Sequence, residues 1–213
     1  MPKVIGIAGQ VGAGKSLVLQ TLNVLYGIPL FDCDKIAKES YFIPSVREEI
    51  IDRFGVDPIK GNGELAKEGI SKLLANKQTK EELERIVHGT VREQFGLWKA
   101  QQASKWVALE SAILFTSNMY QLCDVTIAVK AETPIRMSRV LKRDPYRSEK
   151  GFELLENLQR EETTRQNDEA DWHIDNSGNT SIIRELEVIY HQLDNIIQHK
   201  QRSLILSKRA DSV

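Results

Sequence analysis

The segment with the clearest chemical potential is Gly9–Ser16, which fits the pattern G-x-x-x-x-G-K-S/T and directly follows the apolar run Val4–Ala8. Glycines let consecutive backbone N–H groups turn toward a phosphate, and the following helix presents its positive N-terminal end to the same anion. In this pattern Lys15 reaches the β- and γ-phosphates, and the Ser16 hydroxyl ligates Mg²⁺. An ordinary glycine-rich turn is the alternative, but the strand before the loop and the periodic leucines after it favour a phosphate-binding loop. The sequence therefore predicts a nucleoside triphosphate site lined by Gly12, Ala13, Gly14, Lys15, Ser16 and Leu17.

Two carboxylates follow the second apolar run, in the segment Phe31–Asp34. We expect Asp32 and Asp34 to face the same way at the carboxyl end of a parallel strand, where open α/β sheets bind ligands. A carboxylate near the γ-phosphate can accept a proton from an attacking hydroxyl or help to hold Mg²⁺, as a small-molecule kinase requires. The alternative for one of the pair is a helix N-cap before Lys35–Ser40.

A third group of charged residues lies between residues 139 and 168, on a polar background with helical periodicity. Such a run is usually a solvated helix face. In a chain with a phosphate-binding loop, however, planar guanidinium groups on a helical hairpin can close over the triphosphate and neutralise its charge. We therefore favour a lid, which would carry Arg139, Arg143, Arg147, Arg160 and Arg165.

The elements that must position these groups follow from the alternation of short apolar runs with stretches of helical period. This alternation predicts an α/β fold of the P-loop NTPase type, with a five-stranded parallel sheet flanked by helices. About 75 residues of helical pattern separate the second and third strands, far more than a simple crossover needs. We expect a single domain with core segments 1–31, 104–138 and 169–203, a helical acceptor-binding insertion at 32–103 and a helical lid at 139–168. The predicted strands are Lys3–Ala8, Pro29–Phe31, Trp106–Glu110, Val125–Val129 and Trp172–Ile174, and the longest predicted helices are Lys80–Ala103 and Ser181–Gln201.

The composition excludes several other classes of protein. The 213 residues are 41% hydrophobic, with a formal net charge of −1, so nothing indicates a nucleic-acid partner or an anionic membrane surface. No apolar run approaches the roughly 20 residues that span a bilayer, and the first strand begins too early for a signal peptide. Cys33 and Cys123 form no C-x-x-C pair, and we expect both to be buried small residues. A cytoplasmic protein, either a monomer or a weak homo-oligomer, is the resulting expectation.

Two longer patterns carry a resemblance to the dephospho-CoA kinase family. The family pattern G-G-I-G-S-G-K-S/T-T resembles Gly9–Leu17, and V-x-D-A-D-x-I/V-A-R/K resembles Leu30–Lys38. The second match is the more discriminating one. Four shorter patterns extend the resemblance over nearly the whole chain. The first two are L/I-x-H-P-x-V/I-R, which resembles Ile86–Arg92, and D-I/V-P-L-L-F/Y-E, which resembles Glu110–Thr116. The other two are R-x-x-x-R-D/N, which resembles Arg139–Asp144, and D-x-V/I-I-x-N-x-G, which resembles Asp171–Gly178.

The resemblance implies transfer of the γ-phosphate of ATP to the ribose 3′-hydroxyl of dephospho-CoA, which yields coenzyme A. Asp34 is then the carboxylate that orients and deprotonates the hydroxyl, with Asp32 nearby in the metal shell or as a helix cap. Lys15 bridges the phosphates. Arg139 and Arg143, four residues apart on one helical face, are expected to contact the transferring phosphoryl group when the lid closes.

The same resemblance assigns residues to the two substrates. The candidates for binding the phosphates and ribose of the acceptor are Asp32, Lys38, His88 and Arg92. For His88, a structural histidine on the surface or in the core of a helix is the open alternative. Asn176 and Gly178 follow the last predicted strand and are expected near the adenine of ATP.

The chain departs from the family patterns at Gln10, Leu17, Gly89, Glu110, Ala112 and Thr116. Glu110 keeps the negative charge of the aspartate that it replaces. Leu17 lacks a hydroxyl that could bond the α-phosphate, a loss on the order of 1 kcal/mol. Gly89 is expected to loosen a helix start, and Thr116 removes a carboxylate near the acceptor. A kinase of the same fold with another small acceptor is one alternative function. A regulatory protein that binds nucleotide without turnover is another.

Overall fold

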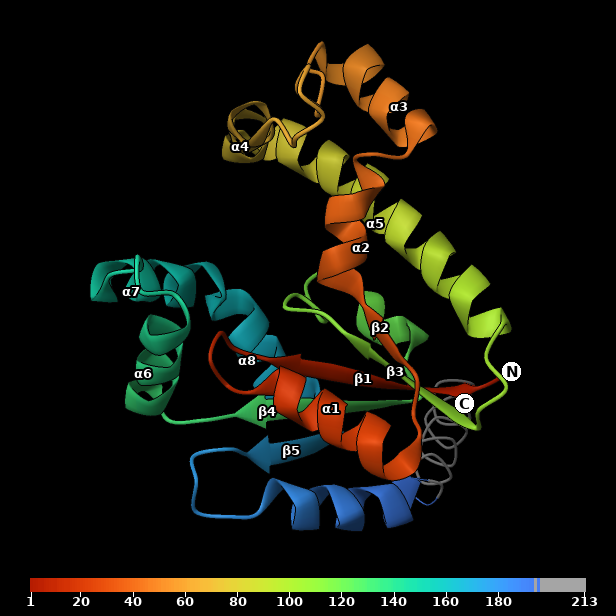
Figure 1. Cartoon of the computed structure of the whole chain (residues 1–213), viewed down its shortest axis with the longest axis vertical. Helices are drawn as coiled ribbons and strands as arrows, with labels where there is room; N and C mark the ends of the chain where they lie inside the picture. Colours follow the sequence, from red (N-terminus) through yellow and green to blue (C-terminus); the bar gives the residue numbers. More distant parts are fainter. Residues whose placement is uncertain (194, 196–213) are drawn as a thin grey trace, which may run out of the picture. The chain divides into compact units, whose positions relative to one another are not determined.

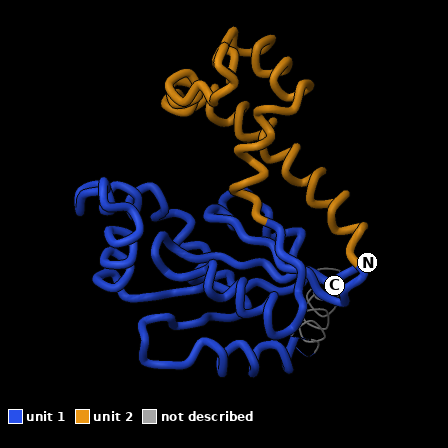
Figure 2. The backbone as a smooth tube through the Cα atoms, in the orientation of Figure 1, with its two compact units in different colours: residues 1–31, 103–213 blue, residues 32–102 orange. Residues whose placement is uncertain are grey.

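The computed structural model describes residues 1–193 and 195. The chain divides into two compact units, shown in Figure 2. The first unit contains residues 1–31 and the chain from residue 103 onward, and the second contains residues 32–102. In the described part of the chain, no helix is both long and apolar enough to cross a membrane.

The first unit is built on a five-stranded parallel sheet with the order β2-β3-β1-β4-β5, as the sequence predicts. The register pairs Ile7 of β1 with Glu110 of β3, and Gly9 of β1 with Val129 of β4. All five predicted strands are present and differ from the predictions only at their ends. They are β1 (Lys3–Gly9), β2 (Leu30–Asp32), β3 (Trp106–Glu110), β4 (Val125–Lys130) and β5 (Trp172–Asp175).

The central strands form because they are nearly continuous runs of apolar residues, and they are buried on both faces. Helix α1 (Lys15–Tyr26) contributes Val18, Leu19 and Leu22 to the same core. In Figure 1, β1, β4 and β5 point toward the side of the sheet on which α6 and α7 lie. The carboxyl ends of these strands therefore meet the region that the sequence assigns to the lid.

Three helices occupy this region, α6 (Thr133–Arg143), α7 (Glu149–Leu158) and α8 (Arg160–Glu169), while η1 (Met119–Leu122) lies between β3 and β4. Residues 182–193 form a further helix, which confirms the first part of the predicted Ser181–Gln201. Residues 194 and 196–201 of that prediction lie outside the described residues. The same holds for residues 194 and 196–203 of the predicted core segment 169–203. Cys33 is buried as expected, but Cys123 is only half-buried because it lies in the turn after η1.

The second unit is helical, as predicted, and contains α2 (Cys33–Ser40), α3 (Pro44–Phe54), α4 (Lys67–Ala75) and α5 (Lys77–Ala100). Helix α5 begins before the predicted Lys80 because the Asn76 side chain accepts hydrogen bonds from the backbone N–H groups of Gln78 and Thr79. Gly89 lies in the middle of α5, so the expectation that it loosens a helix start is wrong. Leu83, Ile86, Val87, Val91 and Phe95 form the buried face of this helix.

Candidate active site

The phosphate-binding loop connects β1 to α1 and has the backbone geometry of an anion site. Gly12 and Gly14 adopt φ angles of +78° and +98°, which side chains disfavour. The N–H of Ala13 closes a turn onto the carbonyl of Gln10 at 3.0 Å. Within the described residues, the backbone N–H groups of Gly12, Gly14, Lys15 and Ser16 donate to no acceptor. These donors are available for an anion, which is the chemistry that the sequence predicts for the loop.

Lys15 begins α1 and is held at the mouth of the loop. Its Nζ donates to the carbonyl of Gly9 at 2.9 Å and lies 3.7 Å from Oε1 of Glu110. Glu110 ends β3, the strand next to β1, and the parallel register brings this strand end beside the loop. In the family pattern Glu110 stands out only as a replacement of aspartate that keeps the charge. Its place at the end of an apolar strand was the signal that could have identified it as a site residue.

Ser16 and Glu110 are the residues that fit Mg²⁺ best in this region. A serine hydroxyl and a carboxylate are hard oxygen donors, and both belong to residues next to or in contact with Lys15. No group of three or more potential His, Cys, Asp or Glu ligands occurs among residues 1–193 and 195. Mg²⁺ usually keeps several waters and binds substrate phosphates together with one or two protein oxygens.

The carbonyl side of the loop is held by Arg139 and Asn176. Nδ2 of Asn176 donates to the carbonyl of Ala13 at 2.7 Å, and Nη2 of Arg139 donates to the carbonyl of Asn176 at 2.9 Å. Nη1 of Arg139 also reaches the carbonyls of Gly12 and Ala13 at 3.4 and 3.5 Å. In this structure Arg139 and Asn176 therefore support the loop backbone. Gly178 lies beyond them with a φ of +97° and open space around its Cα.

Arg143 lies one turn beyond Arg139, at the last residue of α6. Its side chain is exposed, and it makes no hydrogen bond or ion pair with the described residues. The neighbouring Arg147 is held by Asp144, with Nε 3.1 Å from the carboxylate. Arg143 is thus available to an anionic ligand, whereas Arg139 is already engaged with the loop.

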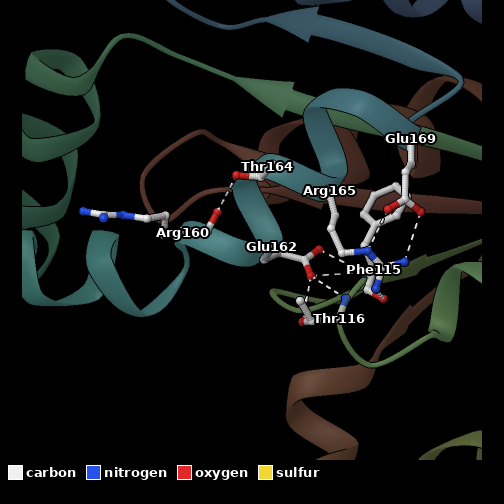
Figure 3. A network of polar contacts seen from close by, with 7 residues as sticks. All are labelled: Phe115, Thr116, Arg160, Glu162, Thr164, Arg165 and Glu169. Atoms are coloured by element: carbon white, nitrogen blue, oxygen red, sulfur yellow. Dashed lines mark hydrogen bonds and ion pairs between the residues drawn. The ribbon is translucent and has the colours of Figure 1, made fainter.

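Helix α8 is anchored to the loop that follows β3, as Figure 3 shows. Glu162 is only 4% exposed, and its carboxylate accepts hydrogen bonds from the backbone N–H groups of Phe115 and Thr116 at 2.8 to 3.2 Å. The Thr116 hydroxyl donates to the same carboxylate at 2.9 Å. Nη1 of Arg165 donates to the carbonyl of Phe115 at 2.5 Å, and Glu169 pairs with the same guanidinium. The family pattern has a glutamate at this position of the chain. Here the residue is Thr116, and the carboxylate beside it belongs to Glu162.

Asp32 and Asp34 differ from the sequence prediction. Strand β2 ends at Asp32, and Asp34 lies in the first turn of α2, so the two carboxylates do not share the face of a strand. Oδ1 of Asp32 accepts a hydrogen bond from the N–H of Lys35 at 2.8 Å, which confirms the helix-cap alternative for one of the pair. Asp34 belongs to the helix because this cap starts α2 immediately after β2. Asp34 is half-buried, and Asp32 is exposed.

The proposed acceptor residues of the second unit lie mainly on α5. Glu84, His88 and Arg92 are spaced four residues apart, so they share one face of the helix. Burial lowers the pKa of His88 below its usual 6.5, Glu84 opposes this shift and Arg92 adds to it. A neutral imidazole suits hydrogen bonding to a hydroxyl better than pairing with a phosphate, whereas Arg92 carries a permanent charge. Lys38 is exposed near the end of α2.

Comparisons with known proteins agree on one family. The family model for dephospho-CoA kinase matches residues 3–181. A dephospho-CoA kinase of Porphyromonas gingivalis is 34% identical over 161 residues, which cover 75% of this chain and 79% of the relative. The corresponding protein of Fusobacterium nucleatum is 29% identical, with 83% of this chain and 90% of the relative covered.

Solved structures share the fold. A Thermus thermophilus protein, TT1252, superposes with a TM-score of 0.76 and 28% identity, over 90% of this chain and 98% of that one. A shikimate kinase of Acinetobacter baumannii has a TM-score of 0.51 and 16% identity, over 91% of this chain and 93% of that one, and this likeness concerns the fold alone. Because the family model spans most of the sequence, the chain belongs to the dephospho-CoA kinase family.

Proposed function

We propose that this protein transfers the γ-phosphoryl group of ATP to the ribose 3′-hydroxyl of dephospho-CoA, giving coenzyme A and ADP. The match of residues 3–181 to the family model is the observation that carries this proposal. The phosphate-binding loop supports it independently, because its free N–H groups and Lys15 are suited to the β- and γ-phosphates of a nucleotide.

At the donor site, the backbone N–H groups of the loop bind the phosphates while Lys15 bridges the β- and γ-phosphates. Lys15 is held by Glu110 and the carbonyl of Gly9, so its ammonium group is already oriented at the mouth of the loop. Ser16 and Glu110 would hold Mg²⁺, which neutralises charge on the phosphate oxygens when bound. Arg143 makes no hydrogen bond or ion pair with the described residues, so it can contact the transferring group.

At the acceptor site, Asp34 orients the 3′-hydroxyl and takes its proton. Asp32 fixes the start of α2 as a helix cap and so helps to position Asp34 two residues later. Arg92 and Lys38 bind acceptor phosphates, and neutral His88 bonds a ribose hydroxyl. In this assignment residues 32–103 form the acceptor-binding part of the enzyme and residues 139–168 the lid, with Asn176 and Gly178 on the adenine side of ATP. The enzyme works in the cytoplasm as a monomer or weak homo-oligomer.

A coupled ADP-release assay tests the function. The panel comprises dephospho-CoA, nucleoside monophosphates, adenosine and small alcohols, each with ATP and Mg²⁺, and Lys15→Ala serves as the inactive control. Turnover confined to dephospho-CoA is the expected result. Turnover on a different acceptor would assign the chain to another small-molecule kinase activity. ATP binding without any turnover would indicate a regulatory protein.

A pair of variants tests the role of the base. Asp34→Asn is expected to remove phosphoryl transfer while the affinity for ATP stays within a few fold of that of the unaltered chain. Asp52→Asn is the matched control, because Asp52 is an exposed carboxylate on α3 of the same unit. A large loss of ATP affinity in Asp34→Asn alone would contradict the assigned role.

A further inference from the structure

A buried arginine on α6, Arg136, lies against the phosphate-binding loop. The residue is 2% exposed, and every nitrogen of the guanidinium has a partner. Nε donates to the carbonyl of Ala131 at 2.9 Å, and Nη2 donates to Oγ1 of Thr133 at 2.9 Å and to the carboxylate of Glu156 on α7. Nη1 lies 3.4 Å from the carbonyl of Val11, inside the loop. Arg136 therefore joins α6, α7 and the loop through a single planar group.

The backbone of the same residue also contacts the loop. A Cβ placed on Gly12 would lie only 2.5 Å from the carbonyl oxygen of Arg136. Val11, the residue before Gly12, is held from a second direction, since its N–H donates to Oε1 of Gln159 at 2.9 Å. Gln159 connects α7 to α8. Both polar groups of Val11 are thus held by side chains of the α6–α8 segment.

The geometry of this cluster requires the ion pair with Glu156. A buried guanidinium without an anionic partner is strongly unfavourable, and the carboxylate of Glu156 is the acidic group that contacts it. The guanidinium carbon of Arg136 lies over the ring of Phe152, 5.6 Å from its centroid. This cation–π contact further restricts the guanidinium group. The position of α7 therefore determines where Arg136 can lie, and Arg136 in turn contacts Val11 and Gly12.

We propose that Arg136 is a positioning residue for ATP. It contacts the carbonyl side of the loop and acts through Val11 and Gly12, whose placement sets the direction of the N–H groups that bind phosphate. Small displacements of such donors weaken binding, because charge stabilisation depends on their preset orientation. The role of Arg136 rests on the proposed ATP site but does not depend on the identity of the acceptor.

The test compares three single variants with the unaltered chain. Arg136→Gln removes the charge and the contact to Val11, and Gln159→Ala removes the other contact to Val11 while leaving the buried ion pair intact. Arg184→Gln is the matched control, because Arg184 is exposed on the helix of residues 182–193. For each variant, the dissociation constant for MgATP, the KM values for ATP and acceptor, kcat and Tm are measured well below the lowest Tm.

We expect Arg136→Gln to lower kcat/KM for ATP by about 10- to 100-fold and to weaken MgATP binding, with the KM of the acceptor unchanged. Gln159→Ala should act in the same direction to a smaller extent, and Arg184→Gln should have no effect. A purely structural role predicts a lower Tm with unchanged ATP binding, and that result in a folded Arg136→Gln would overturn the proposal.

If Arg136→Gln does not fold, Gln159→Ala and Glu156→Gln decide the matter. Unchanged MgATP affinity in both variants would overturn the proposal, and weakened affinity would support it. The MgATP titration also separates this inference from the proposed function. An unaltered chain that binds MgATP but does not use dephospho-CoA would contradict the function and leave the test of Arg136 intact.

Discussion

Replacement of Gly12 by alanine should destabilise the protein through two separable effects. The first is backbone conformation, since a φ of +78° costs a residue with a Cβ about 1–2 kcal/mol. The second is steric, because the new Cβ would lie 2.5 Å from the carbonyl oxygen and 3.0 Å from the Cα of Arg136. These are backbone atoms that cannot rotate away, and overpacking of this kind costs about 1–3 kcal/mol. The free energy of unfolding should therefore fall by about 2–5 kcal/mol, which corresponds to a decrease in Tm of about 4–20 °C.

The control for this variant is Gly27→Ala. Gly27 ends α1 with a φ of +63°, but no atom lies within 4 Å of the position of its Cβ. This substitution carries only the conformational cost of about 1–2 kcal/mol. Thermal unfolding of both variants is measured with and without MgATP, because a ligand that binds the native state raises Tm. Gly12→Ala should lose part of the increase caused by MgATP, and Gly27→Ala should keep it. If Gly12→Ala were no less stable than Gly27→Ala, the close approach of α6 to the loop would be refuted.

Three further predictions concern single side chains. Leu17→Thr restores a hydroxyl beside the loop at a half-exposed position. The KM for ATP should fall by about two- to tenfold. An unchanged KM would show that the hydroxyl does not contact the nucleotide. Glu162→Gln should lower the free energy of unfolding, measured in urea, by about 1–3 kcal/mol, because the Glu162 carboxylate accepts several hydrogen bonds. The control Glu153→Gln, at an exposed position, should have little effect. Equal losses of stability in the two variants would contradict the argument. Because burial lowers the pKa of His88, the unfolded state binds more protons than the native state, so stability should fall as pH drops below 6.5 toward the native pKa. Thermal unfolding across this range should show a weaker pH dependence in His88→Gln, and an unchanged profile would exclude His88 as the cause.

The sheet and the phosphate-binding loop could be predicted because their signals are local. Strands buried on both faces need continuous apolar runs, and the loop needs glycines at positions with positive φ, as found at Gly12 and Gly14. Two interpretations of Asp32 remained open because this residue satisfies two local rules at once. It can end a strand or cap a helix, and in the structure it does both, which places Asp34 on the helix.

The residues that support the site could not be predicted because their partners are distant in the sequence. Glu162 bonds Thr116 across 46 residues, and Arg136 reaches Val11 across 125. Nothing in the local sequence of either residue distinguishes it from a solvated charge on a polar helix. Thr116 illustrates the consequence. Within the motif it is a lost carboxylate, and in the fold its backbone N–H and its hydroxyl both donate to the carboxylate of Glu162. The motif alone therefore does not show which carboxylate lies beside a given residue. At Leu17 the hydroxyl of Thr21 donates to the backbone carbonyl of Leu17 at 2.8 Å, so Leu17→Thr tests whether a side-chain hydroxyl at this position adds a contact to the nucleotide.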